Sequence, residues 1–176
     1  MTLSTVQQKF VLHWGEMGTR WGINRTVAQI HALLFISQKP LNAEDIVQVL
    51  GVARSNVSNS LKELQGWGIV KRVHVMGDSR DHFESMKDVW EMFRVVLDER
   101  KKREIDPTER MLHEFLAEAE ADKETDEYTR KRLRELTEFF GTTIAWYNQV
   151  RQWPMSALSR FVKAGDKIRK LLSIGD

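Results

Sequence analysis

The sequence contains no cysteine and only three prolines among its 176 residues. The absence of cysteine excludes disulfide bonds, thiolate zinc sites and thiol redox sensing from the mechanisms open to this chain. No run of about 18 uncharged apolar residues occurs, which argues against a membrane-spanning helix. The start MTLSTVQQKF lacks the basic and then apolar layout of a secretion signal. We therefore expect a soluble, cytoplasmic protein.

Charge is unevenly distributed, although the net charge is only +2. Residues 1–80 hold nine Lys and Arg against five Asp and Glu, whereas residues 81–150 hold twelve against eighteen. Residues 151–176 are basic again, with six against two. A mild local excess is usually a solvated face, but this division favours an anionic partner for the first part of the chain.

Capping patterns mark the first two helices. Ser4 with Gln7 three residues later forms a capping box, which predicts a first helix from Ser4 to about Gly18. A second helix follows Asn24, which can cap it, and ends before Pro40. Apolar residues recur at helical spacing in both, which indicates that each helix buries one face.

A short helix, a turn and a longer helix come next. Asn42 with Asp45 can cap the short helix, and Gly51 can end it in a left-handed turn. The following stretch, ARSNVSNSLKELQGWGIVKR, covers Ala53–Arg72 and is helical in its first part. Its apolar residues fall at i, i+4 and i+7, whereas most positions between them are polar. That stripe consists of Val57, Leu61 and Leu64.

Two short segments then predict a β-hairpin. Ile69 to Val75 is rich in β-branched and basic residues, MGDSR is a turn signal, and DHFES can be the return strand. A helix, a short helix, a glycine turn, a second helix and a hairpin are the elements of a winged helix-turn-helix.

The chain after Met86 is helical in pattern. Asp106 followed by Pro107 is a helix start signal with Asp106 as the cap, and Pro154 opens a last helix. The predicted fold class is therefore mainly α with a small β-hairpin wing: a winged helix-turn-helix plus a helical dimerisation region. We assign 1–22 to an N-terminal helix at the dimer junction, 23–86 to the winged helix-turn-helix, and 87–176 to dimerisation and effector sensing.

The polar face of the helix after Ala53 suits the DNA major groove. That groove is about 12 Å wide, so side chains facing base edges must be slim and must donate and accept hydrogen bonds. A solvent-exposed polar face is the alternative, and Ala53 departs from the pattern because Ser, Thr or Asp usually caps such a helix. The alternatives there are a cap by Ser55 or a frayed start. The predicted DNA contacts are Arg54, Ser55, Asn56, Ser58, Asn59 and Lys62, with Lys71 and Arg72 facing the DNA backbone.

The span from Asn42 to Met86 resembles the winged helix of MarR-type transcription regulators. The strings SNVSNSLKELQGWGIVKR, GDSRDHFES, DVWEMF and ERKKREIDPT resemble the narrower GbsR branch, named for control of glycine betaine synthesis from choline. The resemblance implies an Asp-x-Arg motif in the wing, here Asp78 and Arg80, whose arginine enters the minor groove. The alternative for these two residues is a simple turn with a local ion pair, which is weak when exposed.

A helix-turn-helix usually dimerises, because one helix reads too few base pairs. The resemblance implies that terminal helices of two subunits intertwine, and packing inside one subunit is the alternative for these residues. The predicted dimer residues are Phe10, Trp14, Phe161, Ile168, Leu171 and Leu172.

The resemblance implies an effector pocket between the winged helix and the dimer helices, and aromatic residues are plentiful around that junction. A cage of aromatic faces can hold a quaternary ammonium such as choline by cation–π attraction, although aromatic stripes at helical spacing are more often core. The pocket residues we name are Trp21, Trp90, Phe93, Trp146 and Tyr147.

No enzyme or cofactor motif stands out. The five histidines lack the spacing of metal ligands, and His74 and His82 are read as surface histidines beside phosphates. We therefore expect a homodimeric regulator, most simply a repressor, that binds a palindromic DNA operator and responds to a small molecule. The alternative is a winged-helix module that binds proteins and not DNA.

Overall fold

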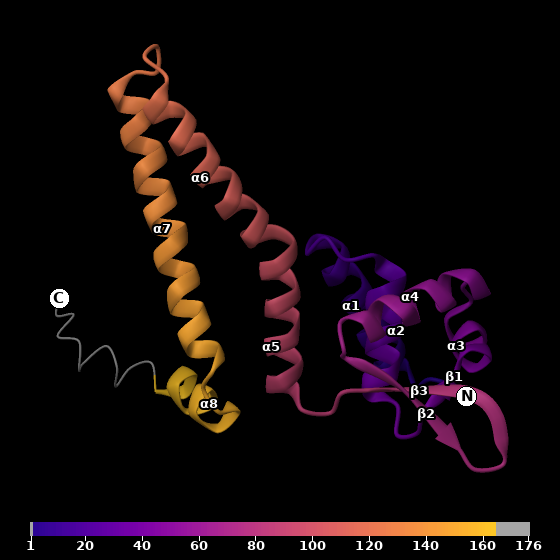
Figure 1. The fold of residues 1–176 in the computed structure, drawn as a ribbon. Coiled ribbons are helices and arrows are strands. Elements are labelled where there is room, and N and C mark those ends of the chain that lie inside the picture. The colour runs from indigo at the N-terminus through magenta and orange to yellow at the C-terminus, as the bar shows by residue number, and fades with distance from the viewer. Residues whose placement is uncertain (1, 165–176) are drawn as a thin grey trace. The chain divides into compact units, whose positions relative to one another are not determined.

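The computed structural model describes residues 2–164, and the chain divides into two compact units, Met1–Val95 and Val96–Asp176. The described part of the first unit contains four complete helices, the first part of a fifth helix and a three-stranded sheet (Figure 1). In chain order these elements are α1 Thr5–Arg20, α2 Arg25–Ile36, β1 Leu41–Asn42, α3 Ala43–Leu50, α4 Arg54–Gly66, β2 Val70–Val75, β3 Asp78–Ser85 and the first part of α5 Val89–Arg100.

The core of the first unit lies between α2, α4 and the sheet. The predicted stripe of α4 is buried, since Val57, Leu61 and Leu64 are each at most 2% exposed. Ile30 and Ile46 join them from α2 and α3. Burying a side chain of this size contributes about 1.5–3 kcal/mol, so this stripe fixes which face of α4 points outward.

The predicted capping box at Ser4 and the predicted cap at Asn42 both form, and the cap at Asn42 is also a capping box. Ser4 Oγ accepts a hydrogen bond from the Gln7 backbone N–H, and Asn42 Oδ1 accepts one from the Asp45 N–H. Gly51 ends α3 with φ of 65°, the left-handed conformation expected of it. The sequence therefore located these helix ends correctly.

Helix α1 ends at Arg20, two residues after the predicted end near Gly18. Gly18 is buried where α1 packs on α2, and a Cβ at this position would lie 2.5 Å from the Ala28 Cβ. The glycine permits close helix packing, and the chain turns instead at Gly22, whose φ is 73°.

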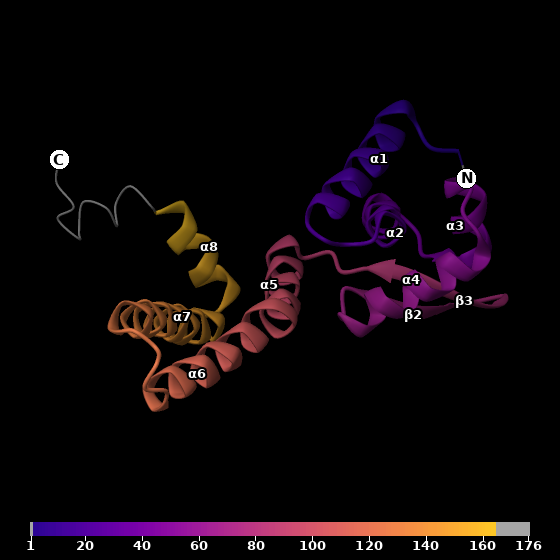
Figure 2. The same cartoon turned by 90° about the horizontal axis from the view of Figure 1, so that it is seen from above.

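The sheet has the order β1-β3-β2, with both pairings antiparallel. Two features differ from the prediction. The return strand begins at Asp78 because only Met76 and Gly77 form the turn, with Gly77 at a φ of 83°. The short strand β1 was not predicted, since two residues are too few to show an alternating pattern. Helix α4 packs against β2 (Figure 2).

The second unit is entirely helical in its described part, residues 96–164. After α5 the chain forms a π-helical turn, η1 Lys101–Ile105, followed by α6 Asp106–Ala121, α7 Glu127–Arg151 and α8 Met155–Lys163. Helices α6 and α7 pack against each other as a hairpin. Among the described residues no helix is long and apolar enough to cross a membrane.

The prediction that Asp106 caps a new helix is wrong. Ile105 and Asp106 both have helical backbone angles, so the helix runs on from η1 without a break. The Asp106 carboxylate instead forms an ion pair with Lys101 at 2.6 Å. The start of α8 after Pro154 is as predicted.

Candidate nucleic-acid interface

Helix α4 presents a continuous polar face to solvent. Its apolar residues and Ser60 are turned inward, which leaves the other positions on the outer side. All six side chains predicted to contact DNA from this helix are exposed: Arg54, Ser55, Asn56, Ser58, Asn59 and Lys62.

The start of α4 carries no side-chain cap. Ala53 holds the N-cap position with φ −61° and ψ 142°, and the helix begins at Arg54. Ser55 therefore lies inside the first turn and does not cap the helix. Backbone N–H groups of such a first turn lack intrahelical partners and suit an anionic oxygen.

A basic hollow lies between α4, α3 and the hairpin. Four cationic side chains and two acidic ones line it, so its net charge is positive. Two of the cations form ion pairs with the acidic residues of the hollow: Arg54 with Glu44, and Arg72 with Asp81 at 3.2 Å. The lining residues are Ala43, Glu44, Arg54, Ser58, Leu61, Lys62, Gln65, Arg72, Arg80, Asp81 and Phe83.

Lys71 and Arg72 lie on opposite faces of the hairpin, as neighbours on a strand must. Arg72 lines the basic hollow, whereas Lys71 forms an ion pair with Glu84 at 2.9 Å. The two residues therefore do not form one patch, and only Arg72 shares a surface with α4.

Arg80 sits in a bulge of the wing and is held by Asp78. Between the pairs Val73–His82 and Val75–Asp78, β2 has one residue and β3 has three, so β3 bulges around Arg80. A bulge bends a strand and re-aims a side chain.

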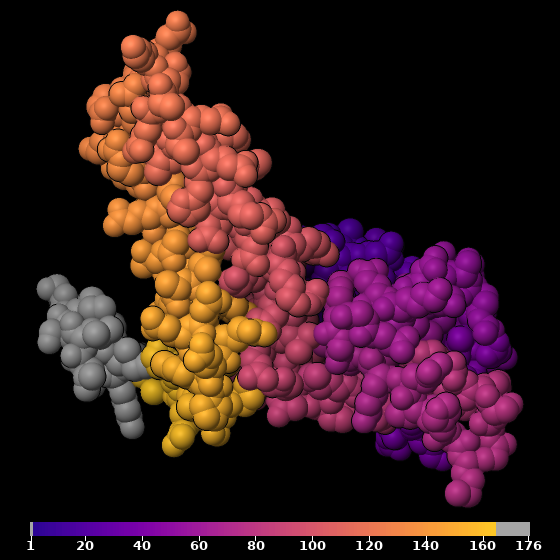
Figure 3. Space-filling view, in the orientation of Figure 1, coloured from indigo at the N-terminus to yellow at the C-terminus, as the bar shows by residue number. Residues whose placement is uncertain are grey.

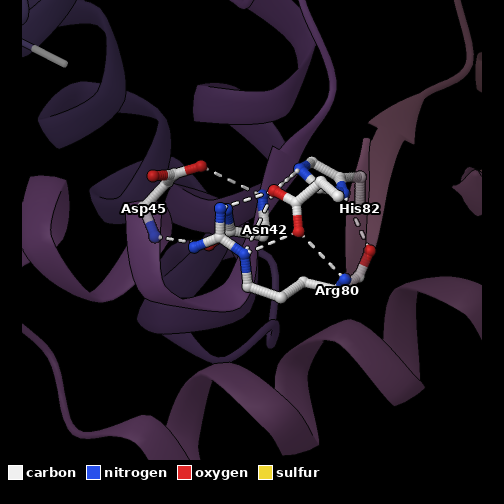
Figure 4. Close-up of polar contacts among 5 residues, drawn as sticks. Asn42, Asp45, Arg80 and His82 are labelled. Atoms are coloured by element: carbon white, nitrogen blue, oxygen red, sulfur yellow. Dashed lines mark hydrogen bonds and ion pairs between the residues drawn. The ribbon is translucent and has the colours of Figure 1, made fainter. Parts of the chain in front are cut away.

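The contact between Asp78 and Arg80 is bidentate. Arg80 Nε lies 2.9 Å from Asp78 Oδ1, and a terminal guanidinium nitrogen lies 2.5 Å from Asp78 Oδ2 (Figure 4). The Arg80 backbone N–H also donates to Asp78 Oδ1 at 3.0 Å. These hydrogen bonds hold the pKa of the Asp78 carboxyl well below its usual range, so the carboxylate stays ionised. The Arg80 side chain is still 54% exposed and available to a ligand.

His82 contacts both members of the Asp78–Arg80 pair. The sequence-based interpretation of His82 as a surface residue is wrong. His82 is buried at 6% exposure, opposite Asn42 of β1. Its Nδ1 lies 2.9 Å from the Arg80 carbonyl oxygen, and its Nε2 lies 3.5 Å from Asp78 Oδ2. No sequence signal revealed this role, because the burial of His82 depends on the unpredicted strand β1.

The remaining predicted sites are spread over both units. Phe10 and Trp14 stack at 5.6 Å and pack against the core of the first unit. This packing within one subunit is the alternative given above, and their place at a dimer interface stays a prediction. Phe161 contacts Trp153 edge to face at 5.4 Å. The remaining predicted dimer residues, Ile168, Leu171 and Leu172, lie outside the described residues.

The effector-pocket residues also divide between the units. Trp21 and Trp90 belong to the first unit together with Phe93, and Trp146 and Tyr147 belong to the second. The Tyr147 hydroxyl donates to Asp98 at 2.5 Å, so this phenol is part of a polar contact. A shared pocket stays a prediction. Within residues 2–164 no group of three or more His, Asp and Glu side chains could hold a metal ion.

The fold and the exposed α4 surface define a winged helix-turn-helix protein. In a comparison with known proteins, residues 21–81 match the model of the MarR family. The chain is similar to YvaV of Bacillus subtilis (strain 168), whose name classes it as an HTH-type transcriptional regulator. The two are 20% identical over 93% of this chain and 91% of that protein.

A solved structure supports the same fold. The crystal structure of a transcriptional regulator superposes with a TM-score of 0.56 at 18% identity, covering 90% of this chain and 99% of that one. The similarity therefore extends beyond the winged helix to most of the chain, and the family matched is one of transcription regulators.

Proposed function

We propose that this protein is a sequence-specific DNA-binding transcription regulator. The observation that carries the proposal is the surface shared by α4 and the wing, where Ser58, Lys62, Arg72 and Arg80 line one basic hollow. This surface therefore combines uncharged polar side chains, which suit base edges, with cationic side chains, which suit phosphates. Its family match, over residues 21–81, ends one residue after Arg80.

Each part of the surface has a separate task. Helix α4 enters the major groove, where Ser55, Asn56 and Asn59 face base edges. Arg80 reaches the adjacent minor groove, whose negative potential rises as the groove narrows. Lys62 and Arg72 neutralise phosphates, with Arg72 exchanging Asp81 for a phosphate oxygen.

The regulator acts as a homodimer, in the cytoplasm, as a repressor on a palindromic operator. Two copies of α4 spaced by about one DNA turn read two half-sites, which gives the specificity that one helix lacks. Similarity over most of the chain to a protein named as an HTH-type transcriptional regulator supports the role of regulator.

The finer family assignment is the GbsR-like branch, with a quaternary ammonium compound as effector. Its basis is the sequence strings quoted above and the aromatic residues Trp21, Trp90, Phe93, Trp146 and Tyr147. A ligand changes DNA binding only if its affinity differs between two arrangements of the dimer. Choline or betaine should then raise the melting temperature, since binding to the native state stabilises it. No shift with either compound would remove this effector class.

Selection of bound sequences from random duplex DNA tests the main proposal. We expect enrichment of a palindrome whose half-sites lie about 10 base pairs apart, centre to centre. Lys9→Ala is the matched control for Arg80→Ala, because it removes an exposed cation from α1, away from the hollow. The control should select the same palindrome and Arg80→Ala should not. Failure to enrich any sequence would favour a winged-helix module that binds proteins.

A further inference from the structure

Two carboxylates line the basic hollow between α3, α4 and the hairpin, on the surface that the proposed function assigns to DNA. Glu44 forms an ion pair with Arg54, and Asp81 forms one with Arg72 at 3.2 Å. Helix α4 and the hairpin belong to the purple and magenta part of the surface in Figure 3. Negative charge on such a surface opposes the binding of a polyanion, so both carboxylates should lower the affinity for DNA.

Glu44 connects the start of α3 to the start of α4. It lies in the first turn of α3, where a carboxylate interacts favourably with the helix dipole. Asp45 lies in the same turn and completes the capping box with Asn42. The start of α3 is therefore capped without Glu44, whose carboxylate contacts Arg54, the first residue of α4.

Asp81 contacts Arg72 across the hairpin. The register pairs Arg72 with Phe83, so Asp81 is the diagonal neighbour of Arg72 on the other strand. Asp81 and Phe83 both line the hollow, as expected of residues two apart on a strand. An Arg72 terminal nitrogen donates to Asp81 Oδ2. The pairing of the strands therefore directs the Asp81 charge at a cation that we expect to neutralise a phosphate.

These two ion pairs differ from the contact of Asp78 with Arg80. That contact is bidentate, and the Asp78 side chain is only 23% exposed. The Glu44 and Asp81 side chains are 42% and 48% exposed. Exposed ion pairs contribute little stability, whereas bidentate contacts fix the geometry of a guanidinium. Asp78 therefore orients its arginine, whereas Glu44 and Asp81 hold theirs weakly enough for a phosphate to displace them.

We propose that Glu44 and Asp81 limit the affinity for DNA by competing with its phosphates for Arg54 and Arg72. The proposal rests on the proposed function, because it concerns the same surface. Each ion pair lowers the affinity in two ways. The arginine must leave its carboxylate to bind a phosphate, and the carboxylate then lies beside the DNA backbone, which has the same sign of charge.

This competition does not depend on the DNA sequence. It acts on phosphate contacts, which supply essentially all of the affinity for non-specific DNA. A regulator must leave the many non-specific sites of a genome in order to reach its operator. Weaker phosphate binding shortens its stay on those sites, since most differences in affinity among related complexes are differences in the rate of dissociation.

The salt dependence of binding should report the competition. Each phosphate that a protein neutralises contributes about −0.9 to the slope of log affinity against log salt concentration. An arginine that shares its charge with a carboxylate neutralises less than one phosphate. Replacing the carboxylate by an amide should therefore make the slope steeper, by up to about 0.9 for each subunit.

Glu44→Gln and Asp81→Asn test the proposal, because each amide keeps the shape of the carboxylate and removes its charge. Fluorescence anisotropy measures the affinity of the full chain for a duplex of unrelated sequence over a series of salt concentrations. We expect each variant to bind about fivefold more tightly than the wild type at low salt. This advantage should shrink as salt is added, because salt screens the charges.

Glu16→Gln is the matched control, since it removes the same charge from an exposed position on α1, outside the hollow. It should change the affinity less than about twofold. An equal gain in all three variants would show that net charge alone is responsible and would overturn the proposal. Weaker binding by Glu44→Gln and Asp81→Asn would also overturn it, because the carboxylates would then position their arginines as Asp78 does.

Thermal melting checks that each variant is folded. If Glu44→Gln destabilises α3, Asp81→Asn decides the outcome by itself, because Asp81 lies outside that helix. The unrelated duplex also separates this test from that of the proposed function. A selected palindrome without any gain in the variants would refute only the competition. A gain on the unrelated duplex without a selected palindrome would support the competition and refute sequence-specific recognition.

Discussion

Arg80 is the residue on which the DNA-binding surface depends most, and its position is set by two neighbours. The Asp78 carboxylate accepts hydrogen bonds from the Arg80 guanidinium, and His82 contacts both Asp78 and the Arg80 carbonyl. The Asp-x-Arg spacing predicted the first contact. Sequence could not reveal the second, because it requires the bulge in β3 and the burial of His82 opposite β1.

His82→Leu should weaken DNA binding through Arg80. Losing one hydrogen bond of about 1 kcal/mol corresponds to a roughly fivefold loss of affinity. In a protein that already carries Arg80→Ala, the same substitution should have little further effect, since residues acting through one another are not additive. Fluorescence anisotropy on a double-mutant cycle measures both values, with thermal melting as the folding control. Equal losses in both backgrounds would show that His82 acts independently of Arg80.

His31 should make the stability of the first unit depend on pH. It is buried, with its Nε2 lying 3.3 Å from Ser85 Oγ, and burial lowers its pKa from the usual 6.5 to about 4. Between pH 6.5 and 4 the unfolded chain binds a proton that the folded protein does not. The free energy of unfolding should therefore fall by up to about 3 kcal/mol as the pH drops through this range. Above pH 6.5, His31 is neutral in both states and should not make stability depend on pH.

Urea unfolding at pH 7.5 and pH 4.5 measures this effect. His31→Gln is the reference, because it keeps a polar partner for Ser85 but cannot be protonated. The wild type should lose about 2–3 kcal/mol more than this variant on going to pH 4.5. Identical pH dependence in the two proteins would show that His31 is not the group responsible.

At the scale of elements, the helices of the winged domain follow from local signals. The capping boxes at Ser4 and Asn42, the left-handed Gly51 and the apolar stripe of α4 predicted where these helices lie and which face of α4 is free. Elements that depend on tertiary contacts were missed or misplaced. Strand β1 exists through its pairing with β3, and the helical run through η1 into α6 overrides the start signal at Asp106.

Gly18 illustrates a residue whose role is visible only in packing. Gly18→Ala should destabilise the protein by about 1–3 kcal/mol, because the new Cβ would lie 2.5 Å from the Ala28 Cβ and force α1 from α2. Gly141→Ala in α7 is the matched control, since nothing lies within 4 Å of its added Cβ. That variant should be stabilised by about 0.5–1 kcal/mol through helix propensity. Thermal melting of both variants checks the prediction, and stabilisation of both would contradict the packing role of Gly18.

At the scale of the whole molecule, the chain combines a winged helix with a helical hairpin. The winged helix could be predicted because its elements are consecutive and its local signals agree. The buried side of α7 could not be predicted, since periodicity marks apolar residues such as Phe139 and Phe140 without telling which of them is covered. Phe140 is half-buried and Phe139 is exposed, although they are neighbours in sequence.

The salt dependence of DNA binding tests the central claim most directly. Anisotropy titrations of the selected duplex, from 50 to 200 mM salt, give the affinity and the number of phosphates neutralised. For the wild type we predict a steep loss of affinity with salt. Asn59→Ala should weaken binding by about 1–3 kcal/mol with an unchanged slope, whereas Arg80→Ala should weaken binding and also reduce the slope by about 1 for each subunit. Affinity and slope unchanged in both variants would show that α4 and the wing do not form the DNA-binding surface.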